Sequence, residues 1–140
     1  MEILSLDKLN NQKILALHNS ITQPPMYISL ESYQFDSKAK TVFYVIEVGI
    51  LHSNSIHIHK IITRYSILYD LHQKIYPVLK VNNEIIHFPA KKIFRKNNEN
   101  FIKKRASNLQ DYFNQLTKNP FIRKSKDFRE FFGLDTMANN

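Results

Sequence analysis

The chain has 140 residues, of which 43% are hydrophobic, and it contains ten Phe, seven Tyr and no Cys. This length allows one ordinary hydrophobic core, and the lack of cysteine excludes disulfides, thiolate zinc sites and cysteine nucleophiles. With 20 Lys and Arg against 12 Asp and Glu, the formal net charge is +8. Such a charge favours a polyanionic partner, which is nucleic acid, an anionic membrane or an acidic protein.

The first 25 residues are expected to form an N-terminal extension that is partly helical or disordered. Apolar residues at Leu6, Leu9 and Leu17 follow helical spacing only imperfectly, and Pro24-Pro25 then breaks the chain. The N-terminus lacks the basic and apolar regions of a signal peptide, and no apolar run reaches the roughly 18 residues of a membrane span. We therefore expect a soluble intracellular protein.

Three segments with alternating or β-branched sequence predict strands at 26–35, 41–51 and 56–64. The intervening residues 36–40 and 52–55 are rich in polar residues and read as short connections. Consecutive strands joined by short connections usually pair with each other, so these three predict an antiparallel meander.

After Tyr65 the spacing of apolar residues becomes helical. Ser66 is a candidate N-cap for the first helix, and Pro77 marks where that helix should end or bend. A strongly amphipathic helix is expected over 100–118, and a short one over 125–132 with Gly133 as its C-terminal cap. Residues 135–140 are expected to be a frayed tail. The fold class is therefore α+β, with a three-stranded antiparallel sheet packed on a subdomain of three to four helices.

The positive charge is concentrated between Lys91 and Arg105. Seven basic residues and one acidic residue, Glu99, give this segment a net charge of +6. A run of this kind is often only a solvated face, so by itself it does not assign a function. The basic residues are Lys91, Lys92, Arg95, Lys96, Lys103, Lys104 and Arg105.

Four short motifs occur in an order and spacing similar to those of the phox-homology (PX) domain family. Arg64-Tyr65-Ser66, at the end of the third expected strand, resembles the R-[RK]-Y-[ST]-x-F element of that family, and 88–92 resembles its proline-rich loop with a lysine. Residues 101–113 resemble its R-x-x-x-L helix, and 125–132 resemble its closing helix. The likeness covers residues 26–134, with the extension before it and the tail after it.

The resemblance implies a binding site for a phosphoinositide headgroup, the phosphorylated inositol ring of a membrane lipid. Arg64 would contact the 3-phosphate, Tyr65 would lie beneath the inositol ring, Lys91 would reach the 1-phosphate, and Arg105 would bind the 4- and 5-hydroxyls. A guanidinium suits phosphate because it donates two parallel hydrogen bonds. Taken alone, Arg64 could be a solvated charge and Tyr65 a core aromatic, and Lys92 competes with Lys91 for its role.

The loop after Lys91 has the composition of a membrane-inserting segment. Ile93 and Phe94 stand among the auxiliary basic residues Lys92, Arg95 and Lys96. The apolar side chains could enter the bilayer below the headgroups while the cations meet anionic lipid. The alternative is that Ile93 and Phe94 simply pin the loop to the core.

Other chemistry is poorly supported by the sequence. His57 and His59 alternate on one expected strand with His52 nearby, but this spacing matches no common zinc site. The chain has only two glycines, Gly49 and Gly133, and therefore no glycine-rich phosphate loop. No catalytic triad or carboxylate pair stands out, so we expect neither an enzyme nor a resident metal or cofactor.

The favoured hypothesis is a monomeric, cytoplasmic module that binds phosphatidylinositol 3-phosphate and acts peripherally on endosomal membranes, in the manner of a sorting nexin. All four lipid-contacting residue types are present, although Thr63, Ala90 and Ala106 depart from common family residues. Two alternatives stay open: a basic nucleic-acid-binding module that uses 91–105, and a PX-like protein-interaction domain whose lipid pocket is vestigial. The favoured hypothesis expects no nucleic-acid partner, and protein partners are not indicated.

Overall fold

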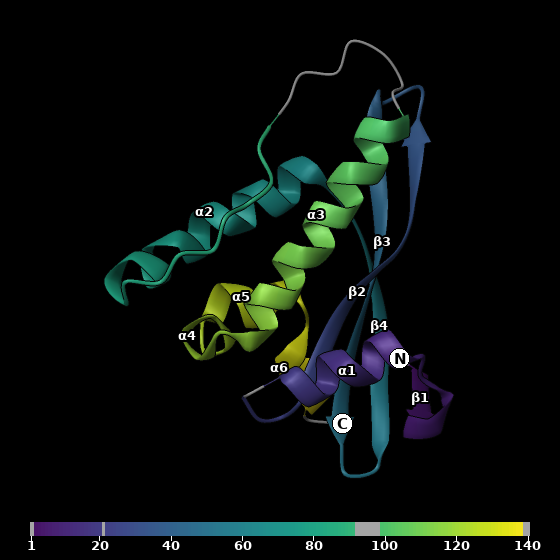
Figure 1. The fold of residues 1–140 in the computed structure, drawn as a ribbon, viewed down its shortest axis with the longest axis vertical. Coiled ribbons are helices and arrows are strands. Elements are labelled where there is room, and N and C mark those ends of the chain that lie inside the picture. Colours follow the sequence, from purple (N-terminus) through teal and green to yellow (C-terminus); the bar gives the residue numbers. More distant parts are fainter. Residues whose placement is uncertain (1, 21, 92–98, 139–140) are drawn as a thin grey trace.

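A twisted antiparallel sheet runs along the long axis of the molecule, with helices packed on both of its faces (Figure 1). This is a computed structural model, and it describes residues 2–20, 22–91 and 99–138. The strands are β1 (Glu2–Ser5), β2 (Met26–Asp36), β3 (Thr41–His52) and β4 (Ser55–Arg64). The helices are η1 (Leu6–Lys8), α1 (Asn11–Asn19), α2 (Tyr65–Val81), α3 (Glu99–Lys118), α4 (Pro120–Arg123), α5 (Lys126–Phe131) and α6 (Leu134–Ala138).

The sheet confirms the expected α+β class and the three-stranded meander, and it contains one further strand. Its strand order is β1-β4-β3-β2, with every neighbouring pair antiparallel. The additional strand β1 pairs with β4 so that Ile3 lies opposite His57. Four residues are too few to show a clear alternation, and the partner strand lies fifty or more residues away, so local sequence did not indicate this strand.

The two faces of the sheet bury different sets of side chains, as the period of two in a strand requires. Tyr44, Ile46 and Val48 of β3 join the main core, which α2 and α3 complete. Tyr27 and Ile58 lie in a second, smaller cluster that Leu17 of α1 closes on the opposite face. Burial of both faces explains why β3 has buried residues at consecutive positions toward its end.

Helix α2 differs from its prediction at both ends. It begins at Tyr65, and the N-cap is Arg64, which makes no side-chain capping bond, so the expectation that Ser66 caps the helix is wrong. The helix also continues through Pro77 to Val81. Proline removes one backbone donor there, but Ile75 and Leu79 are fully buried on either side of it. Their packing in the core holds the last turn against this local cost.

The C-terminal segment is more helical than expected. Gly133 follows α5 with φ of +66°, which confirms its predicted role as the cap, because few residues other than glycine adopt this conformation readily. The predicted frayed tail instead begins inside α6, where Leu134 packs in the core. The short α4 was not predicted, and the Asn119 side chain caps it by accepting from the N–H groups of Phe121 and Ile122.

The N-terminal extension is held on the sheet by a charged network centred on the buried Glu47. Lys13 of α1 places its Nζ 2.7 Å from Glu47 of β3 and 2.9 Å from Glu31 of β2. The Tyr27 hydroxyl donates to the same Glu47 carboxylate at 2.6 Å. Burial and this carboxylate raise the pKa of Tyr27 far above its usual range, so the phenol stays a donor.

Tyr27 also explains one of the two glycines. Tyr27 pairs with Gly49 across β2 and β3, and a Cβ on Gly49 would lie only 2.2 Å from the Tyr27 ring. Only glycine leaves room for this ring, which is fully buried beneath α1.

A second link joins the extension to the C-terminal helices. The guanidinium of Arg123 donates to Ser20 Oγ at 2.9 Å, to the Thr117 carbonyl at 3.1 Å and to the Pro24 carbonyl. Burial lowers the pKa of Arg123 to about 10, yet it remains a cation at neutral pH. These bonds satisfy a nearly inaccessible charge, as burial of a cation demands.

Candidate functional site

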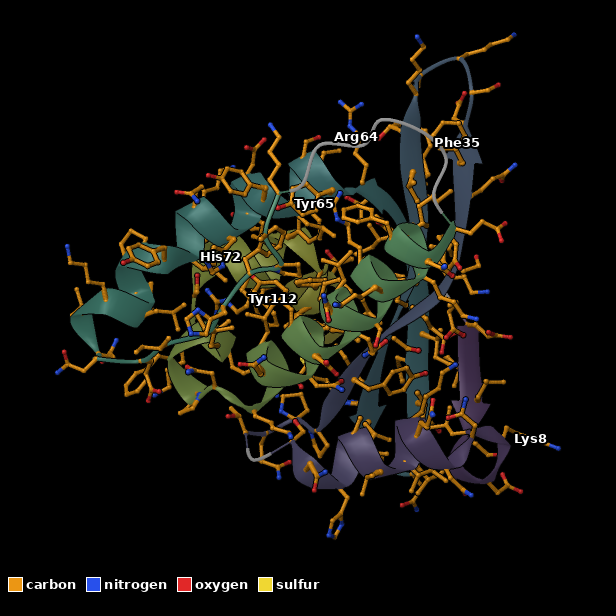
Figure 2. All side chains as sticks on the ribbon, turned by 45° about the horizontal axis from the view of Figure 1, so that its top comes forward. Lys8, Phe35, Arg64, Tyr65, His72 and Tyr112 are labelled. Atoms are coloured by element: carbon orange, nitrogen blue, oxygen red, sulfur yellow. The ribbon has the colours of Figure 1, made fainter. Side chains whose placement is uncertain are left out.

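The candidate site begins where β4 passes into α2, toward the end of the sheet that lies opposite α1 (Figure 1). Arg64 has extended backbone geometry and an exposed side chain, which projects away from the body of the molecule (Figure 2). Among the ion pairs of the described residues, none involves Arg64. Its positive charge is therefore presented to solvent next to Tyr65.

Tyr65 is fixed by contacts with two other segments. Its hydroxyl donates to the Pro89 carbonyl at 2.6 Å, and its ring centroid lies 5.2 Å from that of Phe88. The guanidinium carbon of Arg105 lies 4.1 Å from the Tyr65 ring centroid. Burial raises the pKa of Tyr65 although Arg105 opposes this shift, so the hydroxyl stays protonated and keeps its bond to the 89–90 backbone.

Arg105 lies on the buried side of α3, as its spacing from Leu109 and Tyr112 predicted. The carbon of its guanidinium lies over two rings, 4.1 Å from the centroid of Tyr65 and 4.7 Å from that of Phe101. Its Nη2 also donates to the Ala90 carbonyl at 3.4 Å. Cation–π contacts with two rings orient this planar group.

Lys91 directly follows Ala90, whose carbonyl accepts from Arg105, and its side chain is exposed. Lys91 is thus only one residue from a backbone contact of Arg105. The remaining predicted residues of this loop, which are Lys92, Ile93, Phe94, Arg95 and Lys96, lie outside the described residues.

Behind the site, an aromatic cluster supports the 88–90 segment, and sequence reasoning missed it. Phe88 stacks on His72 with centroids 5.3 Å apart and meets Tyr112 edge-on at 4.9 Å. The His72 Nδ1 and the Tyr112 hydroxyl are 2.9 Å apart, and burial lowers the pKa of His72. Figure 2 shows Tyr65, His72 and Tyr112 between α2 and α3. The helical spacing placed His72 and Tyr112 in the core, but nothing linked them to Phe88.

Tyr44 of β3 is a further residue near the site that the motifs did not indicate. It is buried, and in the sheet it lies beside Tyr33 on one side and Thr63 on the other. Burial raises the pKa of Tyr44, and the nearby Arg105 opposes this shift. The alternation along 41–51 pointed to an inward side chain at 44 but could not show which helix it faces.

A cleft of about 270 Å³ opens beside Arg105, between the first turns of α3 and the 89–90 segment. It is lined by Pro89, Ala90, Phe101, Lys104, Arg105 and Asn108. Two of these six residues carry positive charge and none carries negative charge, so the cleft is suited to an anion.

The histidines of β4 do not gather into a metal site. Within the described residues there is no group of three or more His, Asp or Glu side chains with suitable geometry. His57 is buried and its ring lies 5.4 Å from that of His52, while His59 lies beside Gly133 and hydrogen-bonds to the backbone of Phe132. Over the same part of the chain, no helix is both long and apolar enough to cross a membrane.

Comparison with known proteins finds the same family by sequence and by structure, the PX domain. The family model of the PX domain matches residues 52–135. A designed CISK-PX domain solved by X-ray is 21% identical with a TM-score of 0.60, and the alignment covers 74% of this chain and 95% of that one. The mouse SNX19 PX domain with a bound sulphate ion is 16% identical with a TM-score of 0.60, covering 78% and 97%. No curated protein sequence matches the chain.

Proposed function

This chain belongs to the PX-domain family, and from that premise we propose that it binds phosphatidylinositol 3-phosphate and thereby attaches to endosomal membranes. PX domains generally bind phosphoinositides for membrane targeting and are not enzymes. For this chain we accordingly propose a cytoplasmic, peripheral, monomeric targeting module with no catalytic role.

The observation that carries the proposal is the arrangement of cations around Tyr65. Arg64, Lys91 and Arg105 come from three separate parts of the sequence, and the contacts of Tyr65 with Pro89 and Arg105 draw these parts together. The exposed guanidinium of Arg64 can donate two parallel hydrogen bonds to a phosphate. Arg105 is already oriented by stacking, so binding would cost it little conformational entropy.

Two further observations support an anionic headgroup as the ligand. The mouse SNX19 PX domain was solved with a bound sulphate ion, and sulphate shares the tetrahedral shape and negative charge of a phosphate group. The formal net charge of +8 would add a general attraction to anionic lipid surfaces. Specificity must nevertheless come from the site, because surface charge does not distinguish one phosphoinositide from another.

The proposal includes a membrane-inserting role for Ile93 and Phe94, which rests on the sequence alone. Burying each of these side chains in the bilayer would contribute roughly 1.5–3 kcal/mol. Each of Lys92, Arg95 and Lys96 near an anionic surface would contribute about 1 kcal/mol. Headgroup binding, insertion of the two apolar side chains and attraction of the basic residues to the surface would together make attachment stable. A single one of these contacts would not.

Co-sedimentation with liposomes that carry each of the seven phosphoinositides, at fixed physiological salt, tests the proposal. The wild-type protein should bind the 3-phosphate lipid selectively. Arg64→Ala should weaken this binding by roughly 10- to 100-fold, because it removes a charge-assisted pair of hydrogen bonds. Since Arg64 is exposed, the variant should fold normally, which circular dichroism would check.

Two control variants separate the site from overall charge. Lys8→Ala removes one exposed cation at the opposite end of the molecule and should leave binding nearly unchanged (Figure 2). Arg64→Lys keeps the charge but loses the planar fork, so it should recover only part of the affinity. Equal binding to every anionic liposome, unchanged by Arg64→Ala, would overturn the specific site and direct attention to nucleic acid.

A further inference from the structure

A cavity lies between α1, β2 and the C-terminal half of α3, away from the headgroup site. Figure 1 shows α1 at the end of the sheet that lies opposite the β4–α2 junction. The volume of the cavity is about 280 Å³, close to the lower end of the roughly 300–1,000 Å³ of pockets that hold ligands. The PX-domain match begins at residue 52, so the α1 and β2 walls of this cavity lie outside the matched residues.

One wall of the cavity shows how a side-chain amide binds backbone groups here. Among the described residues β2 is an outer strand of the sheet, with β3 on one side of it. Gln110 of α3 covers its other edge: its Oε1 accepts from the Leu30 N–H at 2.7 Å, and its Nε2 donates to the Ile28 carbonyl at 2.8 Å. These are the two bonds that one residue of a parallel neighbouring strand would make, so a side-chain amide stands in for a strand at this edge.

Three further amides line the cavity and have bonding capacity to spare. The side chains of Gln12 and Asn19 are exposed and have no hydrogen-bond partner in the described part of the chain. Asn114 accepts from Gln110 through its Oδ1 at 3.1 Å, and its NH₂ group donates to no described residue. Each amide offers a carbonyl acceptor and two N–H donors, which are the groups that a peptide backbone needs as partners.

The charge of the cavity is positive on one side. No Asp or Glu lines it. Of its two lysines, Lys13 is paired with Glu31 and Glu47, whereas Lys118 is exposed and forms no ion pair with a described residue. Leu15 also lines the cavity and is 59% exposed, so an apolar surface is available next to the amides.

We propose that this cavity binds an extended peptide segment of a partner protein, and that the segment carries one acidic and one apolar side chain. The inference goes beyond the proposed function, because the cavity shares no residue with the headgroup site. The backbone of the segment is bound by the amides of Gln12, Asn19 and Asn114. Its acidic side chain pairs with Lys118, and its apolar side chain covers Leu15.

The lining favours a peptide over the other polyanions that a basic protein can bind. A nucleic-acid strand is held mainly by several cations along its phosphates, and Lys118 is the one lining cation that is not already paired with a described carboxylate. Neutral amides contribute little to the binding of a phosphate backbone but are complementary to peptide groups. The position of the cavity, at the end of the sheet opposite the headgroup site, leaves it accessible while the protein is attached to a membrane.

The test begins with the full chain and a library of short random peptides displayed on phage. Enriched peptides should share an acidic and an apolar residue at a fixed spacing. The most enriched sequence is then synthesised with a fluorescent label, together with one analogue in which Asn or Gln replaces its acidic residue and one in which Lys replaces it. Fluorescence anisotropy should give weaker binding for the neutral analogue and the weakest for the Lys analogue.

A pair of charge-reversal variants ties this binding to the cavity. Lys118→Glu should weaken binding of the acidic peptide by about tenfold, because it replaces an attraction by a repulsion. It should also make the Lys analogue the better ligand. Lys124 is exposed and has the same charge but does not line the cavity, so Lys124→Glu changes the net charge equally and should leave binding nearly unchanged. Circular dichroism checks that both variants fold.

A second pair tests the apolar contact. Leu15→Ser should weaken peptide binding by roughly fivefold, because an apolar side chain of the peptide loses its partner. Ile14 is the preceding residue of α1 and is also exposed, but it does not line the cavity. Ile14→Ser should therefore leave the affinity nearly unchanged.

The amides supply a direct readout by nuclear magnetic resonance. On addition of the peptide, the side-chain NH₂ signals of Gln12, Asn19 and Asn114 should shift. The NH₂ signal of Asn82, which donates to the Val78 carbonyl at the end of α2, should stay in place. Shifts confined to other parts of the molecule would place the peptide elsewhere and refute the cavity as its site.

The remaining outcomes separate this inference from the proposed function. It is refuted if no peptide is enriched, or if Lys118→Glu and Lys124→Glu change the affinity equally. It is also refuted if a short single-stranded oligonucleotide binds in a Lys118-dependent manner and no peptide does. Arg64→Ala should retain peptide binding and Lys118→Glu should retain lipid selectivity, so either function can fail without the other.

Discussion

The two ends of this molecule use basic residues in opposite ways. Near α1, Lys13 is paired with two carboxylates, and Arg123 donates to a hydroxyl and two carbonyls within the protein. At the other end, Arg64 and Lys91 are exposed and form no ion pair with a described carboxylate. Cations satisfied within the chain stabilise the fold, whereas exposed unpaired cations beside a fixed aromatic ring are available to an external anion.

The same contrast separates the aromatic residues of the two ends. Tyr27 is fully buried, and its hydroxyl is bound by Glu47 inside the protein. Tyr65 is only half-buried, and its hydroxyl positions the backbone that carries Lys91. Substitutions at the α1 end should therefore change stability without changing lipid selectivity, and substitutions such as Arg64→Ala should do the reverse.

The largest effect on stability is expected for Arg123→Met. The variant keeps the apolar stem but leaves Ser20 and the carbonyls of Thr117 and Pro24 without their shared donor. We expect a loss of about 3 kcal/mol in the free energy of unfolding, measured by urea denaturation. Headgroup selectivity at a temperature where the variant is folded should match the wild type. A selective loss of lipid discrimination would show that the two ends are coupled.

A smaller loss of stability is expected for Glu47→Gln. Its control is Glu31→Gln, because both carboxylates pair with Lys13. Glu47 is buried and binds both Lys13 and Tyr27, so neutralising it should cost about 2 kcal/mol. Glu31 is more exposed, and Glu31→Gln should cost less than about 1 kcal/mol because solvent screens its pair with Lys13. Equal losses in the two variants, measured by thermal or urea denaturation, would contradict the assignment of Glu47 as the buried anchor.

The smallest effect concerns pH and the histidine behind the site. Burial lowers the pKa of His72, and it also lowers that of His59, so the folded protein favours the neutral rings. The unfolded chain takes up these protons below about pH 6.5, so stability that is present above this pH is lost as the pH falls. We expect a decrease of under about 1 kcal/mol per histidine between pH 7 and pH 6.

The variant His72→Phe should reduce this pH dependence, because the new ring can still stack on Phe88 but does not titrate. The contribution of His59 should remain. Unfolding midpoints measured from pH 7.5 to 5.5 check the prediction. An unchanged pH slope in the variant would mean that His72 does not contribute to the acid sensitivity.

Sequence patterns predicted the elements with strong periodicity and failed where the determining contact is distant. The strands β2, β3 and β4 and the helix α3 were found within about one residue of their ends, because their apolar residues repeat over many positions. The strand β1, the continuation of α2 past Pro77 and the helix α6 were missed. Each depends on packing against residues far away in the chain, which outweighs a weak or unfavourable local signal.

For the candidate site, sequence indicated the residue types but not their environment. The motifs named Arg64, Tyr65, Lys91 and Arg105, and these assignments remain predictions until binding is measured. The contacts of the Arg105 guanidinium with the rings of Tyr65 and Phe101 could not be anticipated, because helix periodicity indicates which face is buried but not what packs against it. The cleft that Lys104 lines could not be anticipated either, since its facing wall comes from the 89–90 segment.

By itself the sequence determined the α+β class, the meander, the amphipathic helices and the concentration of positive charge, because composition and periodicity are local properties of the chain. Only the tertiary structure decided which charges are paired and which face solvent. Gln110 illustrates the difference: its amide donates to the carbonyl of Ile28 and accepts from the N–H of Leu30 on β2, and nothing near position 110 predicts these two bonds. Long-range contacts set burial, and burial determines whether a given Lys or Arg holds the fold together or is free to meet a ligand.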